Sequence, residues 1–492
     1  MKKAPATKDL EESDDPDLPE GWSHTLAADL ITWSSGKFLP KKRQKHGAVP
    51  IYGGNGIAGY HNTSLVTVPT LIVGRVGALC GNVYLSERAS WVTDNAIYGT
   101  SIAPDLNLKY LQLLFSQAGL NQRSGGSGQP FVNQEILNSV RVPLAPKLEQ
   151  DRIVYSVKQL ESLIQQVANR LDKIPKSLKA LRQSVLAAAC SGRLTEDWRD
   201  GNESLPSTDE LLEEVLSQRR QSWDVECKAA GRNRKYPNPI AFDQNSDLPA
   251  IPETWIWSSA DTLCSQITDG EHIQPPYRET GLPMLTAKHV RDGYVVFDDA
   301  GLISDVDFKK CLQRCAPSEE DILIVSVGAT TGRAAIVEKC PPFAIVRSVL
   351  LLRPLIVPQY FLGWIQSPWC FNWMQSASGA SAQPHLYIND TRRMPVPLPT
   401  LQEQKEIVRR VDALFKLADK IEERVATATK RADKLTQSIL AKAFRGELVP
   451  TEAELARQES RDYESASALV ERIRSDRETA AVTTRRPVTR RN

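Results

Sequence analysis

The residue patterns that could support catalysis are incomplete in this sequence. The strings QPPY at 274–277 and CPPF at 340–343 contain the Pro-Pro-aromatic part of an amino-methyltransferase motif, but neither has the Asn or Asp that would accept from a target amino group. Cys311 and Cys315 are close together, yet no second pair or histidine cluster completes a tetrahedral metal site. A Walker A lysine motif is also absent. We therefore expect a non-catalytic chain without a metal or cofactor of its own, whose cysteines are reduced thiols.

The composition excludes a few classes and leaves others open. A hydrophobic content of 41% can fill the cores of several compact domains in a chain of 492 residues. The net charge of +2 and the pI near 8.0 do not by themselves indicate nucleic acid, because DNA-binding domains often exceed a pI of about 9. No apolar run of about 18 residues is present, and the N-terminus leads into acidic residues where a signal peptide needs an apolar core. We expect a cytoplasmic protein that has no contact with membranes.

The second half of the chain restates the first. The Pro-Glu-x-Trp pattern at 19–22 recurs at 252–255, and Val-Gly-Ala with a following glycine at 76–81 recurs at 327–332. A Gly/Ser stretch ending in Gln-Pro occurs at 124–130 and again at 378–384, and the Glu-Gln pair at 149–150 recurs at 403–404. The first two patterns lie further apart in the second copy, so we expect an insertion between Trp255 and Gly328. Each copy therefore consists of a variable body followed by a shared tail.

The shared tails have the hydrophobic pattern of long, paired helices. Apolar residues alternate at spacings of four and three, which favours helices that pack along their length in coiled-coil fashion. The seam residues in the first tail are Ile153, Val157, Leu160, Ile164, Val167, Leu171, Leu181 and Val185, and those in the second are Ile407, Val411, Leu414, Ile421, Val425, Leu435 and Ile439. Each tail would form a rod of roughly 60 Å at about 1.5 Å per residue.

The two tails differ in ways that predict how they pair. Ala418, Ala428 and Ala432 stand where the first tail has larger apolar residues, so the helices should pair with each other, although pairing with another chain remains the alternative. Pro175 removes a helical hydrogen bond and clashes with the preceding turn, whereas the second tail has Thr429 there. We expect a kink near Ile174, in the first helix only.

The two bodies contain short apolar runs split by glycine, such as 51–56, 71–77 and 321–328. These runs are typical of strands joined by tight turns. Each body ends in its Gly/Ser stretch before the chain enters the tail. The stretch after the first tail contains a Ser-x-x-Glu spacing at 207–210 that predicts a short helix, followed by a polar linker.

The combination of these motifs resembles the DNA-specificity subunit of type I restriction-modification systems, over roughly residues 18–474. The resemblance implies an α/β (α+β) fold with a pseudo-two-fold internal repeat, in which two long antiparallel coiled-coil helices separate two target recognition domains. The expected divisions are a disordered acidic tail at 1–17, a first target recognition domain at 18–142, a helical region at 143–194, a linker with a short helix at 195–247, a second target recognition domain at 248–396, a helical region at 397–448, and a short helix with a basic tail at 449–492. We call 18–142 the first body and 248–396 the second body.

The resemblance also implies a function and partners. Each body would read one half of an asymmetric, bipartite site on double-stranded DNA. The helices would dock two copies of a DNA methyltransferase subunit, and a restriction subunit with ATP-dependent motor activity would complete the complex. S-adenosylmethionine, ATP and Mg²⁺ would then belong to the partner subunits, which would flip and methylate an adenine in each half-site.

Candidate DNA contacts are polar and cationic residues in and near the glycine-rich segments. Side chains would read base edges in the major groove, while backbone amides and Lys or Arg side chains would hold phosphates. The candidates in the first body are Lys37, Lys41, Lys42, Arg43, Asn55, Arg75, Arg123, Ser127 and Gln129, and those in the second are Lys288, Arg291, Arg333, Arg347, Ser381, Gln383 and Asn389. The cluster Lys41-Lys42-Arg43 is the strongest, because adjacent cations can neutralise neighbouring phosphates.

Two other functions fit the same residues. The chain could be a coiled-coil scaffold whose bodies bind proteins and not DNA, or the specificity subunit of an anti-phage methylation system that has no nuclease. A steep loss of DNA affinity with added salt would separate DNA binding from the scaffold hypothesis. The target sequence and the gap between its halves cannot be read from the chain.

Overall fold

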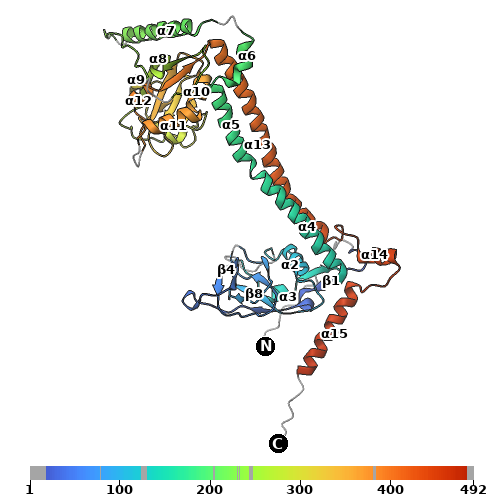
Figure 1. Ribbon diagram of the computed structural model, residues 1–492. Coiled ribbons are helices and arrows are strands. Elements are labelled where there is room, and N and C mark those ends of the chain that lie inside the picture. Colours follow the sequence, from blue (N-terminus) through green and yellow to red (C-terminus); the bar gives the residue numbers. More distant parts are fainter. Residues whose placement is uncertain are drawn as a thin grey trace. The chain divides into compact units, whose positions relative to one another are not determined.

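The structure, a computed structural model, describes residues 18–77, 79–122, 130–202, 206–229, 231, 233–242, 248–379 and 384–484, with side chains to 479. The chain divides into two compact units (Figure 1). Unit 1 comprises Met1–Asp172 and Thr427–Asn492, and unit 2 comprises Lys173–Ala426. Each unit therefore combines one body with part of both tails. The acidic and basic end segments, at 1–17 and 485–492, lie outside the described residues.

The first body, in unit 1, is built on small β-sheets covered by short helices. A four-stranded sheet has the order β2-β8-β5-β6, a three-stranded sheet has the order β4-β3-β7, and β1 pairs with β9. The elements are β1 (Ser23–Leu26), α1 (Ala27–Leu30), β2 (Ile31–Ser35), η1 (Lys41–Arg43), β3 (Val49–Gly53), β4 (Gly56–His61), β5 (Thr70–Gly74), β6 (Val83–Ser86), β7 (Trp91–Val92), β8 (Ala96–Ile102), α2 (Leu108–Gln117), α3 (Gln134–Asn138) and β9 (Arg141–Leu144). Every residue of β5 is buried, as expected for a strand covered on both faces.

The second body, in unit 2, has the same topology. Its sheets have the orders β11-β17-β14-β15 and β13-β12-β16, and β10 pairs with β18. The elements are β10 (Ile256–Ser259), α8 (Ala260–Leu263), β11 (Cys264–Asp269), β12 (Leu282–Leu285), η3 (Ala287–His289), β13 (Gly301–Ile303), α9 (Asp305–Arg314), β14 (Ile322–Val325), β15 (Ala334–Ile336), β16 (Ala344–Ile345), β17 (Val349–Pro354), α10 (Pro358–Ile365), α11 (Pro368–Ala377), α12 (Ile388–Arg392) and β18 (Pro395–Leu398). The expected insertion lies between β12 and β14, where η3 and α9 have no counterpart among the described residues of the first body.

The tails form the helices α4 (Lys147–Leu171), α5 (Ile174–Cys190) and α13 (Leu401–Ala443). The expected interruption of the first tail is present, because α4 ends at Leu171 and Pro175 occupies the first turn of the new helix α5. Thr429 lies inside α13, which is continuous. Within unit 2, α5 and the start of α13 run antiparallel: Leu186 and Ala189 share a small cavity with Ile407 and Val411, whereas Arg182 lies beside Asp419.

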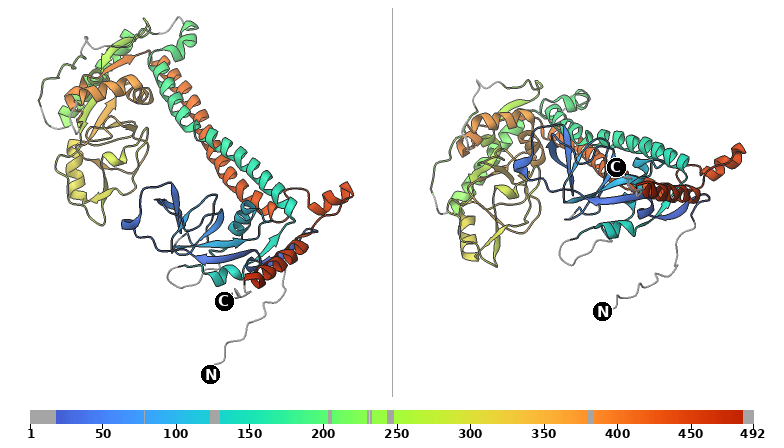
Figure 2. Two further views of the ribbon diagram at one scale, coloured as in Figure 1. Left: turned by 60° about the horizontal axis from the view of Figure 1, so that its bottom comes forward. Right: turned by 90° about the horizontal axis from the view of Figure 1, so that it is seen from below.

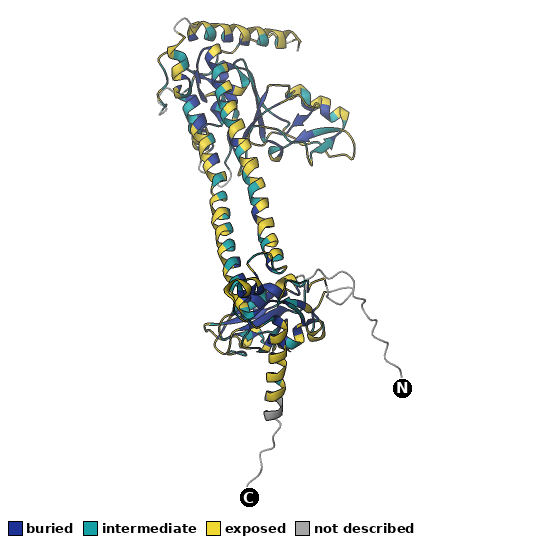
Figure 3. Cartoon of the chain, turned by 90° about the vertical axis from the view of Figure 1, so that its right-hand side faces the viewer, coloured by how far each residue is buried: buried dark blue, intermediate teal, exposed yellow. Residues whose placement is uncertain are grey.

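The predicted inward orientation is wrong for three of the seam residues. Val167, Leu181 and Leu435 are 49%, 40% and 53% exposed, while the other seam residues are buried or half-buried. Exposed and less exposed residues alternate along the long helices (Figure 3). The strict 3.5-residue repeat drifts against the 3.6-residue helix, so the inward face moves on by one residue. Leu181 and Leu435 are equivalent in the repeat, and the inward positions are instead Arg182 in unit 2 and Thr436 in unit 1.

Arg182 places a charge where the sequence predicts an apolar seam. Its Nη2 lies 2.8 Å from an Asp419 carboxylate oxygen and 3.3 Å from one of Glu422, and its guanidinium lies 5.3 Å from the centre of the Phe415 ring. The hydrogen bonds to both carboxylates raise the pKa of Arg182 despite its partial burial. This helix contact is therefore specified by an ion pair as well as by apolar packing.

The internal repeat extends beyond the tails, which the sequence prediction missed. After η2 (Arg193–Thr195) and α6 (Glu196–Asp200), the expected short helix is the long α7 (Thr208–Ala229). In unit 1, α14 (Glu452–Glu459) and α15 (Ala466–Thr484) occupy the equivalent places. In unit 1, α15 lies against α1 and β1 (Figure 2). Arg219 Nε on α7 donates to the Asp261 carbonyl at 2.8 Å, and Arg477 Nη1 on α15 donates to the carbonyl of Ala28, the counterpart of Asp261, also at 2.8 Å.

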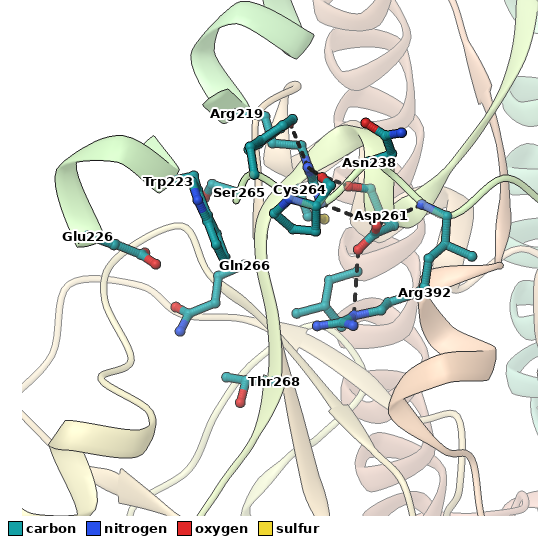
Figure 4. A pocket seen from close by; sticks show the side chains of 14 residues that line it. Arg219, Trp223, Glu226, Asn238, Asp261, Cys264, Ser265, Gln266, Thr268 and Arg392 are labelled. Carbon is teal, nitrogen blue, oxygen red and sulfur yellow. Dashed lines mark hydrogen bonds and ion pairs between the residues drawn. The ribbon is translucent and has the colours of Figure 1, made fainter. Parts of the chain in front are cut away.

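The α7 contact also borders a pocket in unit 2. Arg219 donates to the Tyr236 hydroxyl at 2.6 Å, and the Asp261 carboxylate lies 3.5 Å from Arg392 Nε (Figure 4). Trp223 and Gln266 complete the wall of a cavity of about 300 Å³. These contacts fix α7 on the second body. None of the described helices has a long, apolar stretch of the kind that spans a membrane.

Candidate nucleic-acid interface

Each body is joined to its long helix by the same buried contact. Trp22 Nε1 donates to Glu149 Oε1 at 2.9 Å, and Trp255 Nε1 donates to Glu403 Oε2 at 2.8 Å. Both carboxylates are completely buried. We call the tryptophan and glutamate of each copy the junction. It explains why the Pro-Glu-x-Trp pattern and the Glu-Gln pair recur together, although they lie far apart in the sequence.

The remaining carboxylate oxygens of the junctions have different partners. Glu149 Oε2 accepts the N–H of Glu452 at 2.8 Å, and burial raises the pKa of the Glu149 carboxyl. Glu403 Oε1 accepts the Thr195 hydroxyl at 2.8 Å and is ion-paired with Arg199. In each unit, the segment that follows one tail therefore binds the junction glutamate at the start of the other tail.

The glutamine beside each junction glutamate performs the same task in both copies. Gln150 Oε1 accepts the N–H of Asn107 at 3.1 Å, and its Nε2 donates to the Ala145 carbonyl at 2.9 Å. Gln404 accepts from the N–H of Val357 at 3.0 Å and donates to the Pro399 carbonyl at 3.0 Å. Both amides satisfy buried backbone groups, so the Glu-Gln pairs position the bodies on the helices.

A glycine follows each tail because another segment of the chain packs closely against that position. Gly192 and Gly446 have φ values of +75° and +71°, a region that side chains rarely adopt. An added Cβ would collide with Pro252 at the first site and with Pro19 at the second. These prolines belong to the Pro-Glu-x-Trp patterns, so each pattern contacts both a junction glutamate and the end of a tail.

Three loops of the first body meet at one edge of its sheets. The N–H of Arg75 donates to the Asn95 carbonyl at 2.9 Å, and the N–H of Lys37 donates to the Val92 carbonyl at 2.9 Å. Beside them, Gly53, Asn55, Val76 and Asn95 line a hollow of about 420 Å³. The candidates Lys37, Asn55 and Arg75 therefore come from separate loops to one surface, which we call the loop edge.

Sequence reasoning missed two members of the loop edge. Asn95 is exposed in the turn between β7 and β8, and Thr93 lines the same hollow. The turn composition Thr-Asp-Asn at 93–95 was the available signal, because such residues favour tight turns that present their side chains. Asn55 and Asn95 offer two amides at one edge, and an amide can pair bidentately with adenine.

The loop edge of the second body is the corresponding surface, where the N–H of Ser326 donates to the Ser348 carbonyl at 2.9 Å and the N–H of Glu271 donates to the Ile345 carbonyl at 2.8 Å. Each Gly/Ser stretch ends beside the loop edge of its own body. The N–H of Gly77 donates to the Pro130 carbonyl at 3.3 Å, and in the second body the N–H of Gly328 donates to the Pro384 carbonyl at 3.2 Å. The candidates Arg123, Ser127, Gln129, Ser381 and Gln383 lie outside the described residues.

The cluster Lys41-Lys42-Arg43 forms η1, and all three side chains are exposed. It lies in the long loop between β2 and β3, away from the hollow itself. The N–H of Lys45 donates to His61 Nδ1 at 3.0 Å and so fixes the far end of this loop. The cluster is available to a polyanion.

The candidates of the second body are more dispersed. Lys288 and Arg291 lie in the insertion, where Lys288 Nζ donates to the Asp299 carbonyl at 3.1 Å. Arg333 lies 3.5 Å from Asp292, and Asn389 is exposed on α12. Arg347 is exposed at the turn before β17, and its N–H donates to the Glu271 carbonyl at 2.9 Å.

Equivalent loop positions of the two bodies carry different charges. Lys37 corresponds to Glu271, because both donate their N–H to equivalent residues, Val92 and Ile345. Asp94 of the first body corresponds to Arg347 of the second. The shared scaffold therefore presents different hydrogen-bonding groups at its two loop edges, as two different base sequences would require.

Comparisons with known proteins agree with this architecture. The family model described as "Type I restriction modification DNA specificity domain" matches residues 19–176 and 278–428. The EcoBI specificity subunit of Escherichia coli is 30% identical, over 83% of this chain and 79% of that protein, and the EcoDI specificity subunit of the same organism is 27% identical, over 94% and 96%.

Solved structures show the same fold at low identity. A chain from a structure titled for assembly of "the type I R-M system" has a TM-score of 0.58 at 17% identity, over 88% of this chain and 100% of that one. The HsdS subunit from Thermoanaerobacter tengcongensis has a TM-score of 0.50 at 17% identity, over 88% and 98%. With its repeated bodies, matching junctions and family match, this chain belongs to the type I restriction-modification DNA specificity family.

Proposed function

We propose that this protein is the DNA-specificity subunit of a type I restriction-modification complex and recognises an asymmetric, bipartite site. The observation that carries the proposal is the pair of bodies with one topology and different loop edges. Arg and Lys suit guanine and phosphate, Asn suits adenine, and Glu or Asp suits the cytosine amino group. Each body would therefore read its own half of the target.

Equivalent exposed residues support docking of two copies of one partner. Leu163 on α4 and Leu417 on α13 occupy equivalent positions in the repeat and are 57% and 54% exposed. Lys158, Lys416 and Lys420 are exposed on the same helices. An exposed leucine bordered by charges is a suitable anchor for a protein interface. We assign these faces to two methyltransferase subunits, with S-adenosylmethionine on those partners and with ATP and Mg²⁺ on a restriction subunit.

The salt dependence of DNA binding tests the proposal. We expect the chain, assembled with its methyltransferase, to bind duplex DNA with a logarithmic affinity that falls steeply as the logarithm of salt concentration rises. Replacing Lys41, Lys42 and Arg43 by alanine should reduce the slope by about 0.9 for each lost phosphate contact. Fluorescence anisotropy across a salt series measures both quantities.

The matched control is Lys109→Ala, an exposed lysine on α2 outside the loop edge. It should leave the slope unchanged. An affinity that does not vary with salt in the wild-type complex contradicts DNA binding and favours the protein scaffold.

A further inference from the structure

Each body has a strongly exposed apolar side chain near the start of one loop, between β2 and β3 in the first body and between β11 and β12 in the second, where Tyr277 is also 47% exposed. Phe38 is 71% exposed and Ile273 is 82% exposed. Phe38 directly follows Lys37, and Ile273 lies two residues after Glu271, the counterpart of Lys37. Single exposed apolar residues are common on protein surfaces. Phe38 and Ile273 are one position apart in this register, but each lies within two residues of the loop-edge position and is the most exposed large apolar side chain of its loop.

The base of each loop is held rigidly against its body. An added Cβ on Gly36 would collide with the Thr93 carbonyl, and one on Gly270 would collide with the Ile345 carbonyl. In the first body, Trp91 Nε1 also donates to the Lys37 carbonyl at 3.1 Å. Phe38 and Ile273 are therefore presented on fixed backbone next to the loop edges.

The setting of Phe38 suits a polyanion. Lys37 precedes it, and the three exposed cations of η1 follow it within five residues. The loop is fixed at its far end by the Lys45–His61 hydrogen bond. An apolar side chain between cations matches the stacked bases and flanking phosphates of a duplex, since the cations can hold the backbone while the ring contacts base faces.

We propose that Phe38, and more weakly Ile273, enters the DNA between adjacent base pairs and unstacks one step in each half-site. This inference rests on the proposed function and adds a mode of binding to it. Apolar wedges of this kind kink duplexes, and the bent DNA contacts more of the protein. Unstacking beside the target would also lower the energy that a partner subunit must supply to flip a base. Phe38 should have the larger effect, because the Ile273 loop contains Glu271 and Glu279.

The test uses the full-length chain assembled with its methyltransferase, and a duplex containing the motif identified by methylation mapping. Energy transfer between dyes at the duplex ends reports bending, and anisotropy reports affinity. The wild-type complex should bend the duplex. Phe38→Ala should lose most of the bend and bind about tenfold or more weakly, and Ile273→Ala should lose less.

Duplexes with a nick at successive steps provide the decisive comparison. One nick position should restore the affinity of Phe38→Ala, because a nicked step bends without a wedge. Val306→Ala is the matched control, since Val306 is 79% exposed but lies between Asp305 and Asp307, and it should change neither quantity.

Any of three results would overturn the wedge and leave the proposed function intact. The wild-type complex could bind specifically without bending the duplex, Phe38→Ala could bind as tightly as the wild type, or no nick position could restore the affinity of Phe38→Ala. A wild-type complex that binds no DNA overturns both.

Discussion

Replacing Glu403 with alanine is expected to lower the free energy of unfolding of unit 2 by about 3–5 kcal/mol, the usual cost of breaking a buried ion pair. Glu403 is completely buried and satisfies the Trp255 indole, the Thr195 hydroxyl and the Arg199 guanidinium. Removal of its carboxylate leaves these donors without their acceptor in a site that water does not reach. The second body would lose one of its contacts with α13, while the hydrogen bond between Gln404 and Val357 remains.

Denaturant unfolding followed by tryptophan fluorescence measures this effect. Glu403→Gln should be intermediate, because the amide oxygen keeps an acceptor but loses the charge that pairs with Arg199. Glu423→Ala, an exposed change on the same helix, is the control and should not move the midpoint. The junction has no role in stability if Glu403→Ala unfolds at the same denaturant concentration as this control.

A chain that carries the first body twice is expected to recognise two copies of one half-site. The junction strands make the exchange possible, because β1 pairs with β9 in the same register as β10 with β18: Ser23 faces Leu144, and Ile256 faces Leu398. Residues 24–143 can therefore replace residues 257–397 between unchanged partners. If the bodies read DNA independently, the half of the motif read by the second body should disappear and the other half should occur twice.

Methylation mapping of host DNA that expresses this chain and its methyltransferase measures the outcome. The control is a chain rebuilt with its own residues 257–397 through the same cloning joints. It should give the wild-type motif. A duplicated-body chain that folds, assembles and still methylates the original asymmetric motif would show that the bodies do not read separate halves.

The repeat made much of this architecture predictable. The recurrence of Trp22 and Glu149 as Trp255 and Glu403 indicated equivalent roles, and the structure shows one hydrogen bond in both copies. Pro175 predicted the break between α4 and α5, because proline acts through local geometry. The insertion followed from the changed spacing between motifs.

Long-range packing was not predictable to the same degree. Leu181 and Leu435 fit the heptad pattern, but the accumulated rotation of a real helix places Arg182 and Thr436 on the inward face. The equivalence of α7 and α15 rests on Arg219 and Arg477, which donate to backbone carbonyls that a sequence does not reveal. The loop edge likewise depends on backbone contacts between distant turns.

The central claim is that two bodies of one fold read two different halves of one DNA target. Methylation mapping of host DNA by single-molecule sequencing, with and without the gene for this chain, tests it most directly. We predict an asymmetric motif of two specified parts separated by a gap of fixed length, with one modified adenine in each part, that is lost when the gene is deleted. A continuous motif, or a methylation pattern that is unchanged by the deletion, would contradict the account.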